Sequence, residues 1–202
     1  MKRYRNICLI LLLVFATVLC MTACDSTGDE QTVTYEITVN SKNVSVDTSK
    51  IKVCVYALDG EVVKEEELTN GKAKFELEAD SYVATISGLD EKVSFSSVLL
   101  TKNSRKTTIT LDNSTYDDFE DNYSYVFTVI VLSGDYKLSE LSAQICDLDL
   151  TCINIFFKND NVADGITNGG ECSVEIFDAD NQEIYNETFT VHLDRRFHIV
   201  QL

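Results

Sequence analysis

Apolar and polar residues alternate through most of the chain beyond residue 32, a pattern typical of β-strands with one buried face. The first alternating segment places Val33, Tyr35, Ile37 and Val39 on the same side. Later segments repeat the pattern, and their predicted inward residues are Ile51, Val53, Val55 and Ala57, then Ala73, Phe75 and Leu77, and finally Ile109 and Leu111, with further strands over 82–86 and 93–99. Short strands at this spacing predict an antiparallel β-sandwich over residues 33–111.

Two dipeptides predict the tight turns between these strands. Asp59-Gly60 and Asn70-Gly71 are hairpin signals, because both central residues of a type I′ turn take positive φ. The chain contains no proline, so its turns depend on Asn, Asp and Gly. Abundant Thr and Val with no Trp also favours an all-β protein.

A second alternating region follows residues 112–122, an acidic stretch without periodicity that we interpret as a linker. The predicted inward residues beyond it are Tyr123, Tyr125, Phe127, Val129 and Val131; Leu141, Ala143 and Ile145; Ile153, Ile155 and Phe157; Cys172, Val174 and Ile176; Phe189, Val191 and Leu193; and Phe197 and Ile199. A long polar loop is predicted over 158–170. A helix over 139–148 stays open, because Leu138, Leu141 and Ile145 also fit helical spacing. Residues 123–202 therefore predict a second sandwich.

The N-terminus has the three-part residue pattern of a secretory signal. Three cations within the first five residues precede an apolar run over 7–21, and Thr22 and Ala23 are small residues directly before Cys24. Met21-Thr22-Ala23-Cys24 resembles the lipobox of bacterial lipoproteins, although that family usually has Leu where Met21 stands. The resemblance implies cleavage between Ala23 and Cys24 and diacylation of the Cys24 thiol. A plain secretory signal and a retained membrane span are the alternatives, the span being somewhat short for a bilayer.

The predicted organisation is therefore a signal peptide (1–23), a flexible acidic tether (24–32), a first sandwich (33–111), an acidic linker (112–122) and a second sandwich (123–202). Removal of residues 1–23 leaves 14 basic and 33 acidic residues, because the signal carries three cations and no anion. A surface this acidic repels phosphate groups, so nucleic acid is excluded as a partner. Two acyl chains on Cys24 would hold the protein stably on a membrane.

The stretch 51–89 resembles a transthyretin-like, or prealbumin-like, repeat of bacterial surface proteins. That group includes carboxypeptidase regulatory-like domains, collagen-adhesin B-type repeats and fimbrillin-type lipoproteins. A strand ending in Asp59-Gly60, the Asn70-Gly71 turn, then Phe75 and Leu77, and finally Gly88-Leu89 carry the resemblance, which covers roughly 33–111. It implies a small sandwich that serves in binding, adhesion or assembly at the cell surface.

Few residues suggest catalysis. The two histidines, His192 and His198, both lie near the C-terminus, and we expect His192 to face solvent. No G-x-S-x-G, HExxH, CxxC or Gly-rich phosphate loop occurs. We therefore expect no enzyme and no required cofactor.

One acidic loop partly fits a calcium-binding pattern. Asp160, Asp164, Gly165 and Glu171 match positions one, five, six and twelve of an EF-hand loop, whereas position three is Val162, which offers no side-chain oxygen. We predict a weak Ca²⁺ site at Asp160, Asp164 and Glu171, with an ordinary solvated loop as the alternative.

Four cysteines remain after the signal and Cys24 are set aside. They either stay free and buried as small apolar residues or form disulfides outside the cytoplasm. A bridge, if one forms, is expected between two of Cys146, Cys152 and Cys172.

The leading hypothesis is a lipid-anchored protein of a bacterial cell membrane or outer membrane, exposed outside the cytoplasm. It would act as a non-catalytic binding, adhesion or structural module for a cell-surface protein or carbohydrate. The alternative is a fimbrillin-type anchor or assembly subunit that accepts a β-strand from a neighbour. A hydrolase or envelope-modifying factor is a third hypothesis, which the lack of convergent polar groups disfavours.

Overall fold

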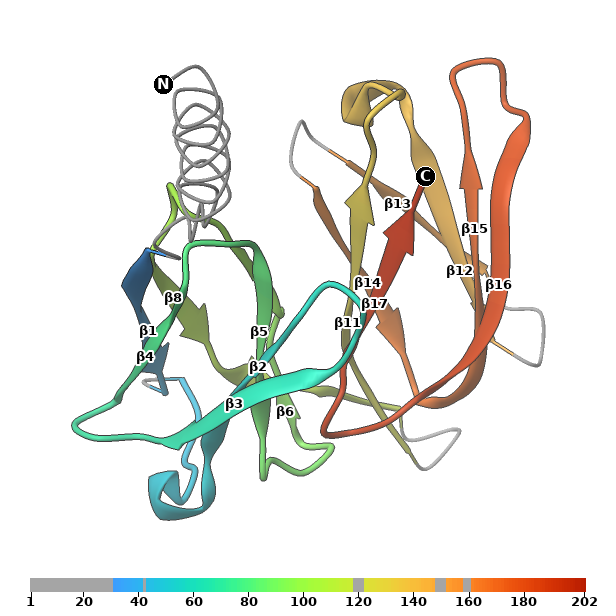
Figure 1. The fold of residues 1–202 in the computed structure, drawn as a ribbon. Coiled ribbons are helices and arrows are strands. Elements are labelled where there is room, and N and C mark those ends of the chain that lie inside the picture. Colours follow the sequence, from blue (N-terminus) through green and yellow to red (C-terminus); the bar gives the residue numbers. More distant parts are fainter. Residues whose placement is uncertain (1–30, 42, 118–121, 148–151, 158–160) are drawn as a thin grey trace, which may run out of the picture. The chain divides into compact units, whose positions relative to one another are not determined.

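The computed structural model describes residues 31–41, 43–117, 122–147, 152–157 and 161–202, and there the chain is all-β, as predicted (Figure 1). Its only helices in those ranges are two short 3-10 turns, Thr48–Lys50 and Leu138–Glu140. None of the described helices is both long and apolar enough to span a membrane. The predicted signal peptide, the lipidation residue Cys24 and all but the last two residues of the tether lie outside the described residues.

The first sandwich is made of two sheets with the orders β4-β1-β8 and β3-β2-β5-β7. Strand β1 pairs antiparallel with β4 and parallel with β8. A small additional pair joins β6 to β9. The strands are β1 (Thr32–Asn40), β2 (Lys52–Tyr56), β3 (Val62–Glu67), β4 (Lys72–Glu78), β5 (Tyr82–Ser87), β6 (Val93–Ser94), β7 (Val98–Leu100), β8 (Lys106–Thr110) and β9 (Asp112–Asn113).

The second sandwich repeats this topology. Its sheets have the orders β14-β11-β17 and β13-β12-β15-β16, and β11 again pairs antiparallel with one neighbour and parallel with the last strand. Strand β10 extends the first of these sheets through β11. The strands are β10 (Thr115–Asp117), β11 (Asn122–Leu132), β12 (Ser142–Asp147), β13 (Cys152–Phe156), β14 (Val162–Thr167), β15 (Gly170–Phe177), β16 (Glu183–Val191) and β17 (Phe197–Gln201).

Each sandwich has its own core, formed mostly by residues that alternation predicted to face inward. Val33, Tyr35, Ile37 and Val39 of β1 are all buried in the first core. Phe127, Val129 and Val131 of β11 occupy the equivalent place in the second core. The hydrophobic pattern therefore selected the inward face of β1 and β11 correctly, because a one-residue shift would move every one of these side chains to the other face of its sheet. The prediction was wrong for β17, where Phe197 and Ile199 face the neighbouring sandwich and Val200 lies in the second core instead. It was also wrong for Leu193, which is exposed beyond the end of β16.

A third apolar cluster joins the two sandwiches. Cys54, Tyr56 and Val83 on the outer face of β2 and β5 pack with Ile130 and Phe197 on the outer face of β11 and β17. The Tyr56 and Phe197 rings meet edge to face with their centroids 5.0 Å apart. Strands β2, β5 and β11 are thus buried on both faces, which alternation alone did not predict.

Because the two sandwiches share one topology, equivalent positions in them can be compared to see how the contact between the sandwiches affects residue type. The register places Thr38, Lys72, Lys106 and Thr108 of the first sandwich at the positions that Ile130, Val162, Phe197 and Ile199 occupy in the second. The first set lies on an outer sheet face with exposed lysines, and the second set faces the neighbouring sandwich. The same backbone position is therefore polar or apolar according to whether another sheet covers it.

Arg196 is the largest fully buried side chain of the joined sandwiches, with no exposed surface. Its Nε donates to the Leu193 carbonyl at 3.0 Å, and its two terminal nitrogens donate to the carbonyls of Val93 and Asp90 on the first sandwich. The rings of Phe95 and Tyr125 lie against the guanidinium, with centroids 5.1 and 4.3 Å away. Desolvation lowers the pKa of Arg196, yet arginine stays protonated in proteins. Carbonyl dipoles and aromatic ring faces therefore take the place of water around this cation.

A chain of hydroxyl groups accompanies Arg196 between the sandwiches. The buried Ser97 amide donates to Thr128 Oγ1 at 2.9 Å, and Thr128 donates to Asp164 Oδ1 at 2.9 Å. Ser97 Oγ also donates to Thr85 Oγ1, and Ser96 Oγ to Asp164 Oδ2. The buried polar atoms of this network are therefore satisfied by partners from both sandwiches, which fixes their register.

Several predictions of local structure were wrong or need refinement. The polar loop predicted over 158–170 contains strand β14, because its residues pair with β11 along the sandwich edge. The segment predicted as a linker over 112–122 includes β9 and β10, which pair with β6 and β11. The helix left open over 139–148 is instead a 3-10 turn followed by β12. The boundary between two independent domains stays a prediction.

The turn dipeptides behave differently from each other. Asn70 and Gly71 both have positive φ and are closed by a Thr69–Lys72 bridge, as a type I′ turn requires. However, β3 and β4 belong to different sheets, so this turn carries the chain across the sandwich rather than closing a hairpin. In Asp59-Gly60 only Gly60 has positive φ, so this dipeptide does not form the type I′ turn, which needs positive φ at both residues.

Replacing Arg196 with Ala should lower the free energy of unfolding by about 3 kcal/mol, because two carbonyls of the first sandwich lose their donor and a buried space opens. Arg105→Ala is the matched control. Arg105 occupies the equivalent turn and its Nε donates to the Lys102 carbonyl at 2.7 Å, but the residue is exposed. Its loss should change stability by less than about 0.5 kcal/mol. Urea unfolding measures both, and equal effects would contradict the role given to Arg196.

Candidate functional site

The outer face of the sheet β13-β12-β15-β16 is the best candidate for a binding surface. In the first sandwich the equivalent face is covered by the second sandwich, whereas no described element covers this one. The register arranges its side chains in rows across the strands. We call this surface the open face; it consists of Ser142, Gln144, Asn154, Phe156, Glu171, Ser173, Glu175, Phe177, Asn186 and Thr188 with the Cys146–Cys152 pair.

Two phenylalanines flank a serine in the first row. Phe156 of β13 and Phe177 of β15 are both cross-strand partners of Ser142 on β12. Their neighbours Ile155 and Ile176 are buried in the core, so alternation directs both phenylalanines outward. Phe156 keeps 65% of its surface exposed, more than the other large apolar residues found exposed in the described part of the chain. The first row is therefore an aromatic pair with a small residue between its members.

The second row consists of polar, hydrogen-bonding side chains. Gln144 pairs with Asn154 on one side and with Glu175 on the other, and Glu175 pairs with Asn186. The Gln144 amide nitrogen donates to Asn154 Oδ1 at 2.9 Å, which holds the two amides in one orientation. The row thus presents amide donors and acceptors with one carboxylate beside the aromatic pair.

A disulfide closes the third row. Cys146 and Cys152 are direct cross-strand partners and are bonded, with their Cα atoms 4.1 Å apart. The structure thus contains a bridge between two of the three cysteines for which one was expected. Cys54 and Cys172 are free and buried, and burial raises the pKa of both thiols. The bridge joins β12 to β13 within the open face. The free thiols are apolar packing residues, Cys54 between the two sandwiches and Cys172 in the second core.

The residues of the predicted calcium site lie on two strands of different sheets. Asp164 is on β14 and its two carboxylate oxygens accept from Thr128 and Ser96, whereas Glu171 is exposed on β15. Asp160 lies outside the described residues. Within those residues, no group of three His, Cys, Asp or Glu side chains is arranged to hold a metal ion. The Ca²⁺ site stays a prediction.

Gly165 has a structural role in its strand. A Cβ at this position would lie 2.4 Å from Ile145 Cδ1 and 3.4 Å from Ile155 Cγ2, both in the second core. The glycine therefore lets β14 approach the opposite sheet.

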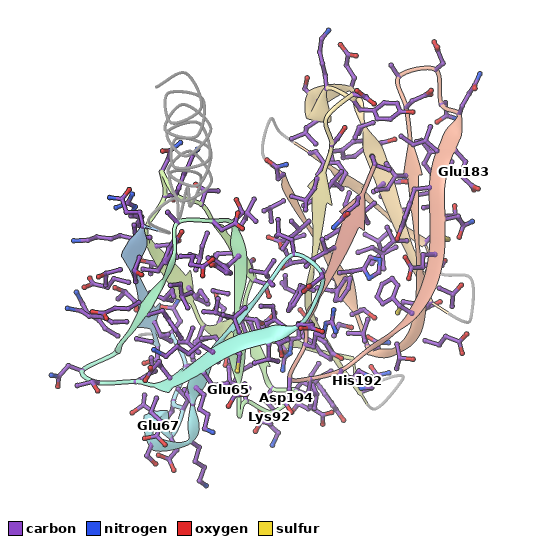
Figure 2. The ribbon with its side chains drawn as sticks, viewed as in Figure 1. Glu65, Glu67, Lys92, Glu183, His192 and Asp194 are labelled. Atoms are coloured by element: carbon purple, nitrogen blue, oxygen red, sulfur yellow. A yellow bond between two sulfur atoms is a disulfide. The ribbon has the colours of Figure 1, made fainter. Side chains whose placement is uncertain are left out.

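The two histidines lie in different environments. His192 is exposed just beyond the end of β16, at the opposite end of that strand from Glu183 (Figure 2). His198 stacks on Phe189 and its Nε2 lies 3.2 Å from the Tyr185 hydroxyl. That hydroxyl donates to Glu187, whose carboxylate lies 3.5 Å from His198 Nε2. Burial lowers the pKa of His198, although Glu187 opposes the shift.

A surface pocket of about 480 Å³ lies in the first sandwich, between the segments 44–50 and 88–93 and beside Asn113. Its two aspartates hold the surrounding backbone. Asp47 caps the first 3-10 turn through the Ser49 amide, and Asp90 accepts from the Lys92 amide. Asp47 and Asp90 therefore contribute to the local structure of the segments that carry them.

Sequence reasoning identified the strands of the open face without recognising the face as a site. The pair Phe156-Phe157 carried a signal, because alternation with Ile153 and Ile155 buries Phe157 and leaves Phe156 outside. The cross-strand neighbours of Phe156 depend on strand order and register, which no local pattern specifies.

No family model matches this chain, and no curated protein matches it either. Among solved structures, a candidate adhesin from Bacteroides ovatus is 9% identical, with a TM-score of 0.32 over 88% of this chain and 90% of that one. Shaft pilin SpaA from Lactobacillus rhamnosus GG is 8% identical, with a TM-score of 0.34 over 85% and 96% of the two chains. The Bacillus anthracis TIE protein is 13% identical, with a TM-score of 0.31 over 84% of this chain, which spans only 33% of that protein. At these TM-scores the likenesses decide nothing about a ligand.

Lowering the pH should destabilise the protein through His198. Because burial lowers the folded-state pKa of His198, the unfolded chain binds a proton near its ordinary value of about 6.5 while the folded chain stays neutral. The contribution is therefore present above pH 6.5 and is lost as the pH falls below it. Urea unfolding at pH 7.5 and 5.0 should show a smaller loss for His198→Gln than for wild type.

His192→Gln is the control for this prediction. His192 is exposed beyond the end of β16 and is not part of the His198 cluster, so this variant should keep the wild-type difference between the two pH values. A wild-type pH difference in His198→Gln would contradict the role given to His198.

Proposed function

We propose that this chain is a lipid-anchored surface protein of a bacterial envelope and acts as a non-catalytic binding or adhesion module. The anchor is Cys24, acylated after cleavage behind Ala23, in the bacterial cell membrane or outer membrane. The binding surface is the open face of the second sandwich. This sandwich is the later of the two along the chain and therefore the more distant in sequence from the anchor.

The observation that carries the proposal is the contrast between the two equivalent sheet faces. In the first sandwich this face bears Cys54, Tyr56 and Val83, and the second sandwich covers it. In the second sandwich the equivalent positions bear Gln144, Cys146 and Ser173. The neighbouring row keeps Phe156, which is 65% exposed, and Phe177, which is half-buried. Exposed aromatic residues beside ordered polar groups are characteristic of interaction surfaces.

The Cys24→Ala variant tests the anchor. Expressed in a bacterium with a lipoprotein pathway, it should take up no labelled fatty acid and should migrate as the uncut precursor. Cys20→Ala is the matched control, because Cys20 lies within the apolar run of the signal and leaves with it. Gel mobility and label incorporation measure the outcome. Acylation of the Cys24→Ala protein at the wild-type level would refute the lipid anchor.

Strand-mediated assembly is a second candidate function, favoured by one observation. Strand β16 is nine residues long and, within the described chain, pairs only with β15. Such an edge can accept a strand from another molecule. The edge strand β3, by comparison, carries Lys64, Glu65, Glu66 and Glu67, which discourage pairing.

The oligomeric state of the purified full chain separates the two functions. A binding module should stay monomeric by light scattering across a wide range of concentrations. Concentration-dependent polymers that survive mild denaturant would instead support strand exchange through β16 and contradict the simple binding module.

A further inference from the structure

The open face carries no cationic side chain on any of its four strands. Strands β12, β13, β15 and β16 contain neither Lys nor Arg, whereas the outer face of β4-β1-β8 carries Lys72, Lys74 and Lys106. Glu171 and Glu175 add negative charge to the open face. A ligand bearing phosphate, sulfate or carboxylate groups would therefore be repelled here, which leaves neutral or cationic ligands, and the stacking and amide groups described next favour a neutral one.

The aromatic row offers the ring of Phe156, which is exposed, and the accessible part of the half-buried Phe177 ring as stacking surfaces. Phe156 and Phe177 lie two strands apart, so their backbone positions are separated by about 10 Å from two inter-strand steps of about 4.8 Å. Ser142 between them is too small to fill the space above the sheet. A flat ligand with apolar faces fits this arrangement, because aromatic rings present a large apolar surface with a negative face toward C–H groups.

The amide row supplies the hydrogen bonds that such a ligand needs at its rim. Gln144 and Asn154 are joined to each other by one bond of 2.9 Å, which orders them while leaving other amide groups toward solvent. Glu175 beside them is an acceptor with two oxygens. Sugar rings have this combined chemistry, since C–H groups cover their faces and hydroxyl groups, both donors and acceptors, surround their edges.

We infer that the open face binds a neutral glycan chain, with Phe156 and Phe177 stacking on two of its sugar rings and Gln144, Asn154 and Glu175 bonding its hydroxyl groups. This inference rests on the proposed function of a displayed binding module and specifies its ligand class. The Cys146–Cys152 bridge holds β13, and with it Phe156, in register with β12. The glycan therefore meets a preformed surface.

The test uses the full chain purified in a detergent without a sugar headgroup, because a glycoside detergent would compete for the face. Immobilised neutral polysaccharides, namely α- and β-glucans, xylan and mannan, are the probes, and a polyuronate is the acidic comparison. Wild type should bind at least one neutral polysaccharide and ignore the polyuronate. Phe156→Ala and Phe177→Ala should each weaken binding roughly tenfold or more, as expected for the loss of one stacking contact.

Two further variants separate stacking from folding. Phe156→Trp should retain binding, because a larger ring preserves the stacking surface. Tyr136→Ala removes an aromatic residue that is 41% exposed but lies outside the open face, and it should bind like wild type. Thermal unfolding of every variant confirms that the fold is intact.

Absence of binding to every neutral polysaccharide, preference for the polyuronate, or unchanged binding by the Phe156→Ala/Phe177→Ala double variant would each overturn the inference. Dependence of a protein ligand, rather than a glycan, on Phe156 would also overturn it. The proposed function is judged separately. A protein that is acylated at Cys24 and attaches cells to a surface while ignoring glycans keeps that function and loses only this ligand class.

Discussion

The buried guanidinium of Arg196 is the contact on which the arrangement of the two sandwiches depends. A charge without exposed surface is tolerated only where dipoles replace its hydration, and here the Val93 and Asp90 carbonyls and two aromatic rings do so. Those groups come from both sandwiches, so the charge is satisfied only when the sandwiches are joined. The equivalent Arg105 makes the same local bond to a carbonyl three residues earlier but remains exposed. The local turn therefore forms without the contact between the sandwiches. Only at Arg196 does the same turn place an arginine where the neighbouring sandwich binds it.

This contact assigns different roles to equivalent sheet faces. One face of each sandwich lies at the junction, and the other two outer faces remain uncovered in the described chain. Terminal units of repeat proteins need polar outer faces to stay soluble. The outer face of β4-β1-β8 follows this rule with its lysines and Glu36, which Lys72 and Lys74 contact. The open face follows it with amides and hydroxyls instead and keeps two phenylalanines, which is why we propose it as the binding surface.

The candidate chemistry was harder to derive from the sequence than the strands were. The EF-hand comparison depended on the spacing of Asp164, Gly165 and Glu171 within an assumed loop, but the first two residues lie in β14 and the third in β15. Spacing along a chain has a different spatial meaning in an extended strand than in a loop. Conversely, Phe156 and Phe177 are far apart in sequence and become neighbours only through their shared partner Ser142.

By itself, the sequence determined the all-β class, most strand positions and most inward residues of both cores, because period-two alternation is a local consequence of strand geometry. It also contains the basic, apolar and small-residue pattern that ends at Cys24, whose interpretation as a lipoprotein signal stays a prediction. Only the tertiary structure decided that Tyr56, Ile130 and Phe197 are buried on the second faces of their strands, that Arg196 is enclosed, and that Cys146 pairs with Cys152. These features depend on which sheet covers which face and on register between distant strands. Such contacts join segments that are far apart along the chain, and a local sequence pattern does not specify which distant segments meet.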